Sequence, residues 1–202
     1  MRTSSAQLAS ETRAERERLA VLFGGLSPEQ WSAPSLCEGW RVREAAAHIT
    51  MPFRTTPLGT MAGLVRAGFS FNRYADRDAR STAHEKSQAE LVDLLRRNID
   101  NPWQPPGGGA AGALSHDVIH GLDATEALGL PASPTDRIAL ALASAGPRQL
   151  KYFGVDLKGR RLTATDADVS VGEGPVAVPM TAKEILLAVT GRRPLGGVSP
   201  TD

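Results

Sequence analysis

Hydrophobic positions recur at helical spacing through most of the first 150 residues of the chain. Residues 8–26 place leucines among glutamates and arginines in the pattern of a long amphipathic helix, which ends near Gly24 and Gly25. Residues 42–49 show a shorter helical pattern. This second helix ends before Pro52, because proline lacks an amide donor and disfavours helical angles in the residue before it.

Further helices follow along the chain. A helix is predicted over residues 57–74, and residues 87–90 form a capping box that opens another. The proline and glycine of residues 101–109 predict a loop. The next helix follows this loop directly and ends near Gly129, and a further one spans residues 133–150.

The hydrophobic period changes after Leu162. Short strands are predicted at residues 161–165, 167–171 and 175–178, and a capping box at residues 181–184 opens a final helix. The sequence therefore predicts a mainly α chain. We expect a helical bundle over residues 1–150, a small α/β appendage over 151–194 and a loose tail over 195–202.

The composition of the chain excludes several classes of protein. The chain is 41% hydrophobic, which is enough apolar material for a core, and its net charge is +1. Basic residues are scattered among acidic ones, so we expect no nucleic-acid partner. No apolar run approaches the roughly 20 residues of a membrane-spanning helix, so we expect no membrane partner and a cytoplasmic location. Cys37 is the single cysteine, which excludes an internal disulfide.

Three of the four histidines form a candidate metal site. His116 and His120 lie four residues apart, so a helix presents both imidazoles on one face, where they can chelate one ion. His48 lies in the helix of residues 42–49 and is the candidate for a third ligand. Three neutral imidazoles with one open position are typical of a catalytic metal site rather than a structural one. The alternative is that this short spacing arises by chance and serves packing.

Other polar residues could support such a site. Asp123, three residues after His120, and Asp117 could orient the imidazoles by hydrogen bonding. Arg41 and Glu44 share the helix face of His48 and could reach a substrate or thiol pocket, or could instead form a surface salt bridge. The three tryptophans are expected to be core and loop-anchor residues.

Several segments resemble the mycothiol-dependent maleylpyruvate isomerase family of the DinB-like superfamily. The segments that carry the resemblance are Leu26-Ser27-Pro28-Glu29-Gln30-Trp31, Pro34-Ser35-Leu36-Cys37-Glu38-Gly39-Trp40-Arg41-Val42-Arg43, Ala47-His48, His120-Gly121-Leu122-Asp123, Ala127-Leu128-Gly129 and, near the C-terminus, residues 164–166, 172–175 and 190–192. Together they touch most of the chain, from Leu8 to Arg193.

The resemblance implies a four-helix bundle that holds a divalent metal, zinc or nickel. The positions that match the family's ligands are His48, His116 and His120. The resemblance also implies a cofactor, a low-molecular-weight thiol such as mycothiol or the related bacillithiol. The metal would activate this thiol for attack on a small electrophile. The superfamily also suggests a homodimer. The isomerase has Glu at the position matched by His116. An all-imidazole site carries one less negative charge, which makes the metal a stronger Lewis acid and argues against maleylpyruvate as the substrate.

Two other functions remain open from the sequence. The run His116-Asp117 and the spacing to His120 are similar to metal-dependent hydrolase helices, in which Asp117 would be a ligand or a general base. A non-catalytic module that keeps the metal for structure is the other alternative. A thiol-dependent transferase or isomerase is the leading interpretation, and the sequence identifies no residue that acts directly in catalysis.

Overall fold

A computed structural model describes residues 3–143 and 147–195 of the chain. It divides into two compact units, Ser4–Ala132 and the part of the chain from Ser133 onward. The sequence predicts a division after residue 150, whereas the structure groups the helix of residues 135–143 with the C-terminal strands. Most of the expected tail, residues 196–202, lies outside the described residues.

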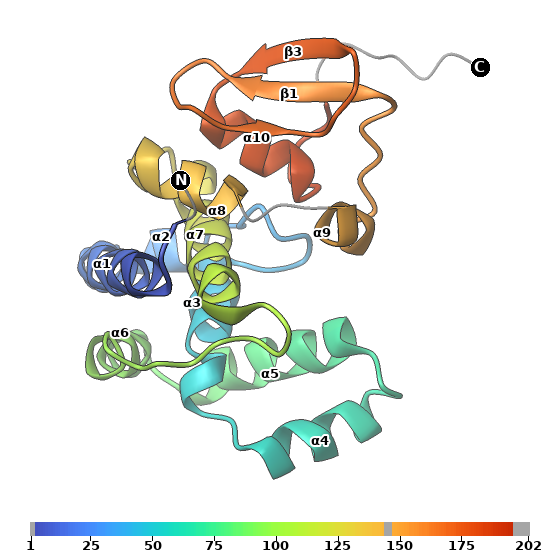
Figure 1. Cartoon of the computed structure of the whole chain (residues 1–202). Coiled ribbons are helices and arrows are strands. Elements are labelled where there is room, and N and C mark those ends of the chain that lie inside the picture. Colours follow the sequence, from blue (N-terminus) through green and yellow to red (C-terminus); the bar gives the residue numbers. More distant parts are fainter. Residues whose placement is uncertain (1–2, 144–146, 196–202) are drawn as a thin grey trace. The chain divides into compact units, whose positions relative to one another are not determined.

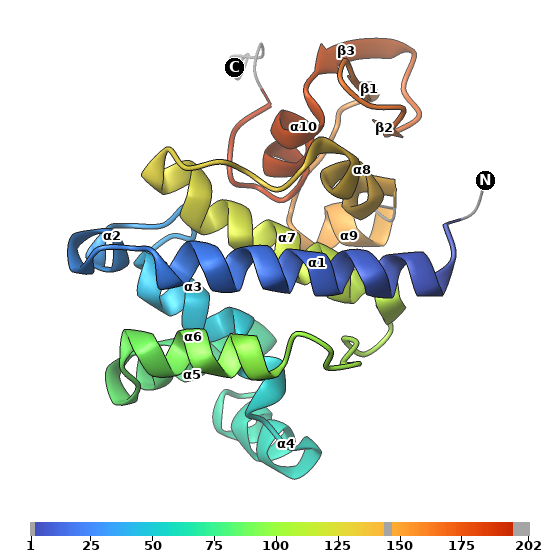
Figure 2. The ribbon, with the colours of Figure 1, turned by 90° about the vertical axis from the view of Figure 1, so that its left-hand side faces the viewer.

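The first unit is helical throughout. Its elements are α1 (Ser5–Gly24), α2 (Pro28–Ser32), α3 (Val42–Ile49), a 3-10 turn (Met51–Phe53), α4 (Pro57–Arg66), α5 (Phe71–Glu85), α6 (Gln88–Arg97) and α7 (Gly109–Leu128). Helix α1 lies along α7 (Figure 2) and also contacts α6, while α3 contacts α6 and α7. These contacts close a ring of four helices, so the bundle predicted from the sequence is confirmed.

One apolar cluster fills this bundle. Leu19 and Phe23 from α1 and Trp31 from α2 are at most 2% exposed, and the rings of Phe23 and Trp31 lie 5.6 Å apart. Fully burying a large apolar side chain contributes about 1.5 to 3 kcal/mol. The cluster consists of Leu19, Ala20, Phe23, Trp31, Val42, Ala46, Ala47, Ile49, Ala83, Leu91, Val92, Leu95 and Ala124. Residues 46, 47 and 49 of this core flank His48, so packing fixes the helix that carries it.

The predicted helix over residues 57–74 is wrong in its middle. Helix α4 ends at Arg66 and α5 begins at Phe71, and the chain turns between them at Gly68 (φ +61°) and Phe69 (φ +58°). A left-handed pair of residues cannot continue an α-helix. Helix α5 then continues to Glu85, a length that the sequence pattern does not predict, because this segment has few large apolar residues to mark a helical period.

The C-terminal unit is a small α/β structure, as predicted. It consists of α8 (Thr135–Ala143), α9 (Pro147–Tyr152), β1 (Arg160–Ala164), β2 (Ser170–Val171), β3 (Val176–Met180) and α10 (Ala182–Val189). In the described part, β1 lies between β2 and β3, antiparallel to β2 and parallel to β3, with Leu162 opposite Val171 and Val178. Helix α10 packs on β1 and α8, and Figure 1 shows it beneath the sheet.

Candidate metal centre

The structure brings together the three histidines that the spacing singled out. His48 lies in the last turn of α3, and His116 and His120 lie one turn apart on α7, which packs against α3. Each offers a ring nitrogen that lies within 4.8 Å of the other two, so the group could hold one metal ion. The ring centroids of His48 lie 5.1 Å from His116 and 4.5 Å from His120. The set is therefore compact and comes from two helices fixed by the bundle core.

Aspartates orient two of the three imidazoles. The Nδ1 of His116 lies 2.8 Å from Asp117 Oδ1, and the Nδ1 of His120 lies 2.9 Å from Asp123 Oδ2. A carboxylate only accepts hydrogen bonds, so in each pair Nδ1 is the donor, and in a neutral imidazole Nε2 then keeps its lone pair. Hydrogen bonds of this kind are typical of metal-binding histidines. The donor chemistry thus fits a divalent metal that binds neutral imidazole.

Asp117 has a second partner that sequence reasoning missed. Its Oδ2 accepts a hydrogen bond of 2.8 Å from Arg16 Nε on α1, and both side chains are 1% exposed. The signal was present in the sequence, because Arg16 lies on the face of α1 that carries Thr12, Leu19 and Phe23, all of which are buried. A charged residue on the apolar stripe of an amphipathic helix usually has a buried partner.

Two tryptophans lie against the imidazoles. The Trp40 ring centroid lies 5.2 Å from that of His48 and 6.5 Å from that of His120, and Trp40 Nε1 donates to Asp76 Oδ1 at 2.7 Å. Trp103, in the loop before α7, lies 5.4 Å from the ring of His116. The interpretation of the tryptophans as core and loop-anchor residues fits Trp31 and Trp40, which are 2% and 8% exposed, and Trp103, which lies in a loop; Trp40 and Trp103 also lie beside the histidine cluster.

Arg41 and Glu44 contact each other. Glu44 is 4% exposed and accepts from Arg41 Nη2 at 2.6 Å and from the Arg41 backbone amide at 2.8 Å, which caps the start of α3. Burial by itself would raise the pKa of Glu44, but the hydrogen bonds and charge of Arg41 outweigh it and lower that pKa. The Glu44 carboxylate in turn raises the pKa of Arg41. Their contribution to a substrate or thiol pocket stays a prediction.

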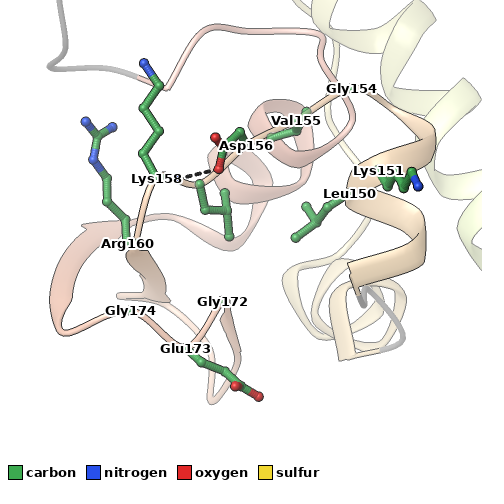
Figure 3. Close-up of a pocket in the computed structure, with 12 residues that line it drawn as sticks. Leu150, Lys151, Gly154, Val155, Asp156, Lys158, Arg160, Gly172, Glu173 and Gly174 are labelled. Carbon is green, nitrogen blue, oxygen red and sulfur yellow. Dashed lines mark hydrogen bonds between the residues drawn. The ribbon is translucent and has the colours of Figure 1, made fainter.

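A cavity of about 400 Å³ lies beside Trp103 in the first unit, between α1, the loop that carries Trp103 and the start of α7. Arg16 and Trp103 both line it. The C-terminal unit has a separate, open cavity of about 530 Å³, between the end of α9, the loop before β1 and the loop between β2 and β3 (Figure 3). There the Lys158 amide donates to Asp156 Oδ1 at 2.8 Å. This second cavity contains none of the residues predicted for the metal site.

Comparison with known proteins agrees with the resemblance in the sequence. Residues 12–102 match the family model described as the mycothiol maleylpyruvate isomerase N-terminal domain. Within the described residues, no helix has the length and apolar character needed to cross a membrane. No curated protein matches the chain.

Two solved structures share the fold. The crystal structure of the mycothiol-dependent maleylpyruvate isomerase superposes with a TM-score of 0.63 at 14% identity, covering 96% of this chain and 92% of that one. A histidine-to-alanine mutant of that isomerase gives a TM-score of 0.62 at 13% identity, covering 95% and 90%. The chain is thus a mainly α protein with the maleylpyruvate isomerase fold. Its residues 12–102 match the model of the mycothiol maleylpyruvate isomerase N-terminal domain, and the predicted resemblance is confirmed.

Proposed function

We propose that this protein binds a divalent metal through His48, His116 and His120 and uses it with a low-molecular-weight thiol, mycothiol or a related one, to transfer that thiol to a small electrophile or to isomerise the electrophile. The observation that carries the proposal is the cluster of three imidazoles, each with a ring nitrogen within 4.8 Å of the others, two of them held at Nδ1 by aspartates. Three protein ligands leave a coordination position for another molecule, which is typical of catalytic sites.

The bound ion would supply the positive charge that holds a thiol as its thiolate at neutral pH. The residues of this chain orient the ligands and surround the site. Asp117 and Asp123 fix the tautomer and orientation of their imidazoles, and both carboxylates are at most 1% exposed. Trp40 and Trp103 place apolar rings beside the cluster, which limits the access of water. The thiolate is the nucleophile of the proposed reaction.

The three-histidine set bears on the choice of substrate. Neutral imidazoles leave the full charge of the ion to act on a ligand, which favours activation of a thiol. Zinc and nickel both suit imidazole ligands, so either is compatible with the site. We propose an electrophile other than maleylpyruvate, because the resemblance implies a glutamate in the isomerase at the position that His116 occupies here.

The hydrolase alternative requires Asp117 to act on the metal or on a water molecule. Both oxygens of Asp117 are engaged, one by Arg16 and the other by His116, and the side chain is buried. A general base must reach the proton that it removes. This arrangement therefore favours an orienting role for Asp117 over a catalytic one.

Binding of mycothiol to metal-loaded and metal-free protein, measured by titration calorimetry, tests the proposal. We expect binding to the zinc-loaded or nickel-loaded protein that the metal-free protein lacks, with release of the thiol proton seen as a dependence of the measured heat on the buffer. A redox-inert analogue in which oxygen replaces the thiol sulfur is the control. Equal binding of the thiol with and without metal would contradict the proposal and favour a non-catalytic module.

A further inference from the structure

Arg16 occupies a costly position for a charged group. Its side chain is 1% exposed on α1, and its partner Asp117 on α7 is equally buried. Removing two charges from water is unfavourable, and replacing a buried ion pair by apolar residues is often neutral or stabilising. Stability alone therefore gives little reason for an arginine at this position, and its contacts indicate another role.

The Nε atom of Arg16 fixes the carboxylate that orients His116. Asp117 Oδ2 accepts from Arg16 Nε at 2.8 Å while Oδ1 accepts from His116 Nδ1 at 2.8 Å. Because each oxygen has its own donor, the plane of the carboxylate is defined by both. Removal of Arg16 would leave the carboxylate free to turn away from His116.

The Nη1 atom of Arg16 also acts on His116 indirectly, through Asn101 and Trp103. It donates to the backbone carbonyls of Asn101 at 2.6 Å and Asn98 at 3.3 Å, in the turn after α6. The side chain of Asn101 accepts from the amide of Trp103 at 3.0 Å, and the Trp103 ring packs on His116. One guanidinium therefore holds both the carboxylate and the aromatic ring that contact His116.

We propose that Arg16 is a positioning residue for the metal centre, which fixes His116 through Asp117 and through the loop that carries Trp103. This inference rests on the proposed function, since it assumes that His116 is a ligand. Lysine would keep the charge but offers a single nitrogen, which cannot replace donors on two sides of a planar group. The positioning role therefore depends on the shape of the guanidinium as well as on its charge.

The dissociation constants of zinc and cobalt(II), measured by competition with a chelator on metal-free protein, test this role. We expect Arg16→Met to weaken metal binding about 10- to 100-fold, the effect typical of outer-shell partners, and Arg16→Lys to recover only part of it. The visible spectrum of the cobalt-loaded variant should also change, because the coordination around the ion is distorted. Arg97→Met, which replaces an exposed arginine paired with Asp93, is the matched control.

Circular dichroism and thermal unfolding of the metal-free variants establish that they are folded. If Arg16→Met does not fold, the same measurements are made on Asp117→Asn. This variant keeps the shape of the side chain and weakens its contacts with Arg16 and His116. Wild-type affinity and spectrum in a folded Arg16 variant, or in Asp117→Asn in its place, would overturn the inference and leave the proposed function standing. Absence of metal binding by the wild type would overturn the proposed function itself, and this inference with it.

Discussion

His120 Nδ1 lies 2.9 Å from Asp123 Oδ2, one turn further along α7, and the aspartate is fully buried. In the neutral imidazole, this contact favours the tautomer that carries its proton on Nδ1. The Asp123 backbone carbonyl also accepts from Leu36 at 2.9 Å, which ties the loop before α3 to α7. Asp123 thus contacts His120 through its side chain and the loop before α3 through its backbone.

Replacing Asp123 tests the orienting role directly. We expect Asp123→Asn to weaken zinc binding by about 10- to 100-fold, because an amide accepts a weaker hydrogen bond than a carboxylate and adds no negative charge beside the imidazole. Chelator competition on metal-free protein measures the effect. Asp93→Asn, an exposed aspartate on α6, serves as the control and should leave the affinity unchanged. Equal affinities for the two variants would show that Asp123 does not act on the metal.

The core tryptophan should affect stability rather than metal binding. Trp31 is 2% exposed and packs on Phe23, so Trp31→Ala should lower the free energy of unfolding by about 3 to 5 kcal/mol. Trp103→Ala should cost less, because Trp103 is only half-buried. Urea unfolding of the metal-free proteins compares them. A larger loss of stability for Trp103→Ala than for Trp31→Ala would contradict this description of the core.

The Arg41–Glu44 cap predicts how stability changes with pH. The pKa of Glu44 is lowered on folding, so its contribution to stability is present above the ordinary carboxyl value of 4.5 and is lost as the pH falls through the folded value. Glu44→Gln should therefore be less stable than the wild type at neutral pH, and the difference should shrink in acid. Urea unfolding at about pH 7 and about pH 4 measures the difference.

Glu17→Gln, an exposed glutamate on α1, is the control for this prediction and should show little difference at either pH. A stability difference for Glu44→Gln that stays constant, or grows as the pH falls, would rule out the proposed linkage. Such a result would mean that the cap acts through its shape and not through the charge of the carboxylate.

The features that sequence predicted well depend on neighbouring residues. Ser87 caps α6 and accepts from the Glu90 amide, Thr181 does the same for α10 with Glu184, and Gly129 ends α7 with φ +64°. Each signal lies within a few residues of its effect. The spacing of His116 and His120 is local in the same way, so their shared helix face was predictable from the sequence.

The partner of Arg16 could not be predicted from the sequence. A charged residue on the apolar face of α1 indicates that it has a buried partner, but Asp117 lies 101 residues away, so nothing near Arg16 identifies it. The break between α4 and α5 was missed although its signals are local. Gly68 adopts φ +61°, and the side chain of Ser70 caps α5 by accepting from the Arg73 amide.

The central claim is that the three histidines bind a metal, and elemental analysis of untagged protein tests it most directly. We predict near-stoichiometric zinc or nickel in the wild type and in His84→Ala, which replaces an exposed histidine on α5, and loss of the metal in His120→Ala. Well-folded wild-type protein that takes up no metal even after incubation with divalent ions, or His120→Ala that retains it fully, would contradict the account.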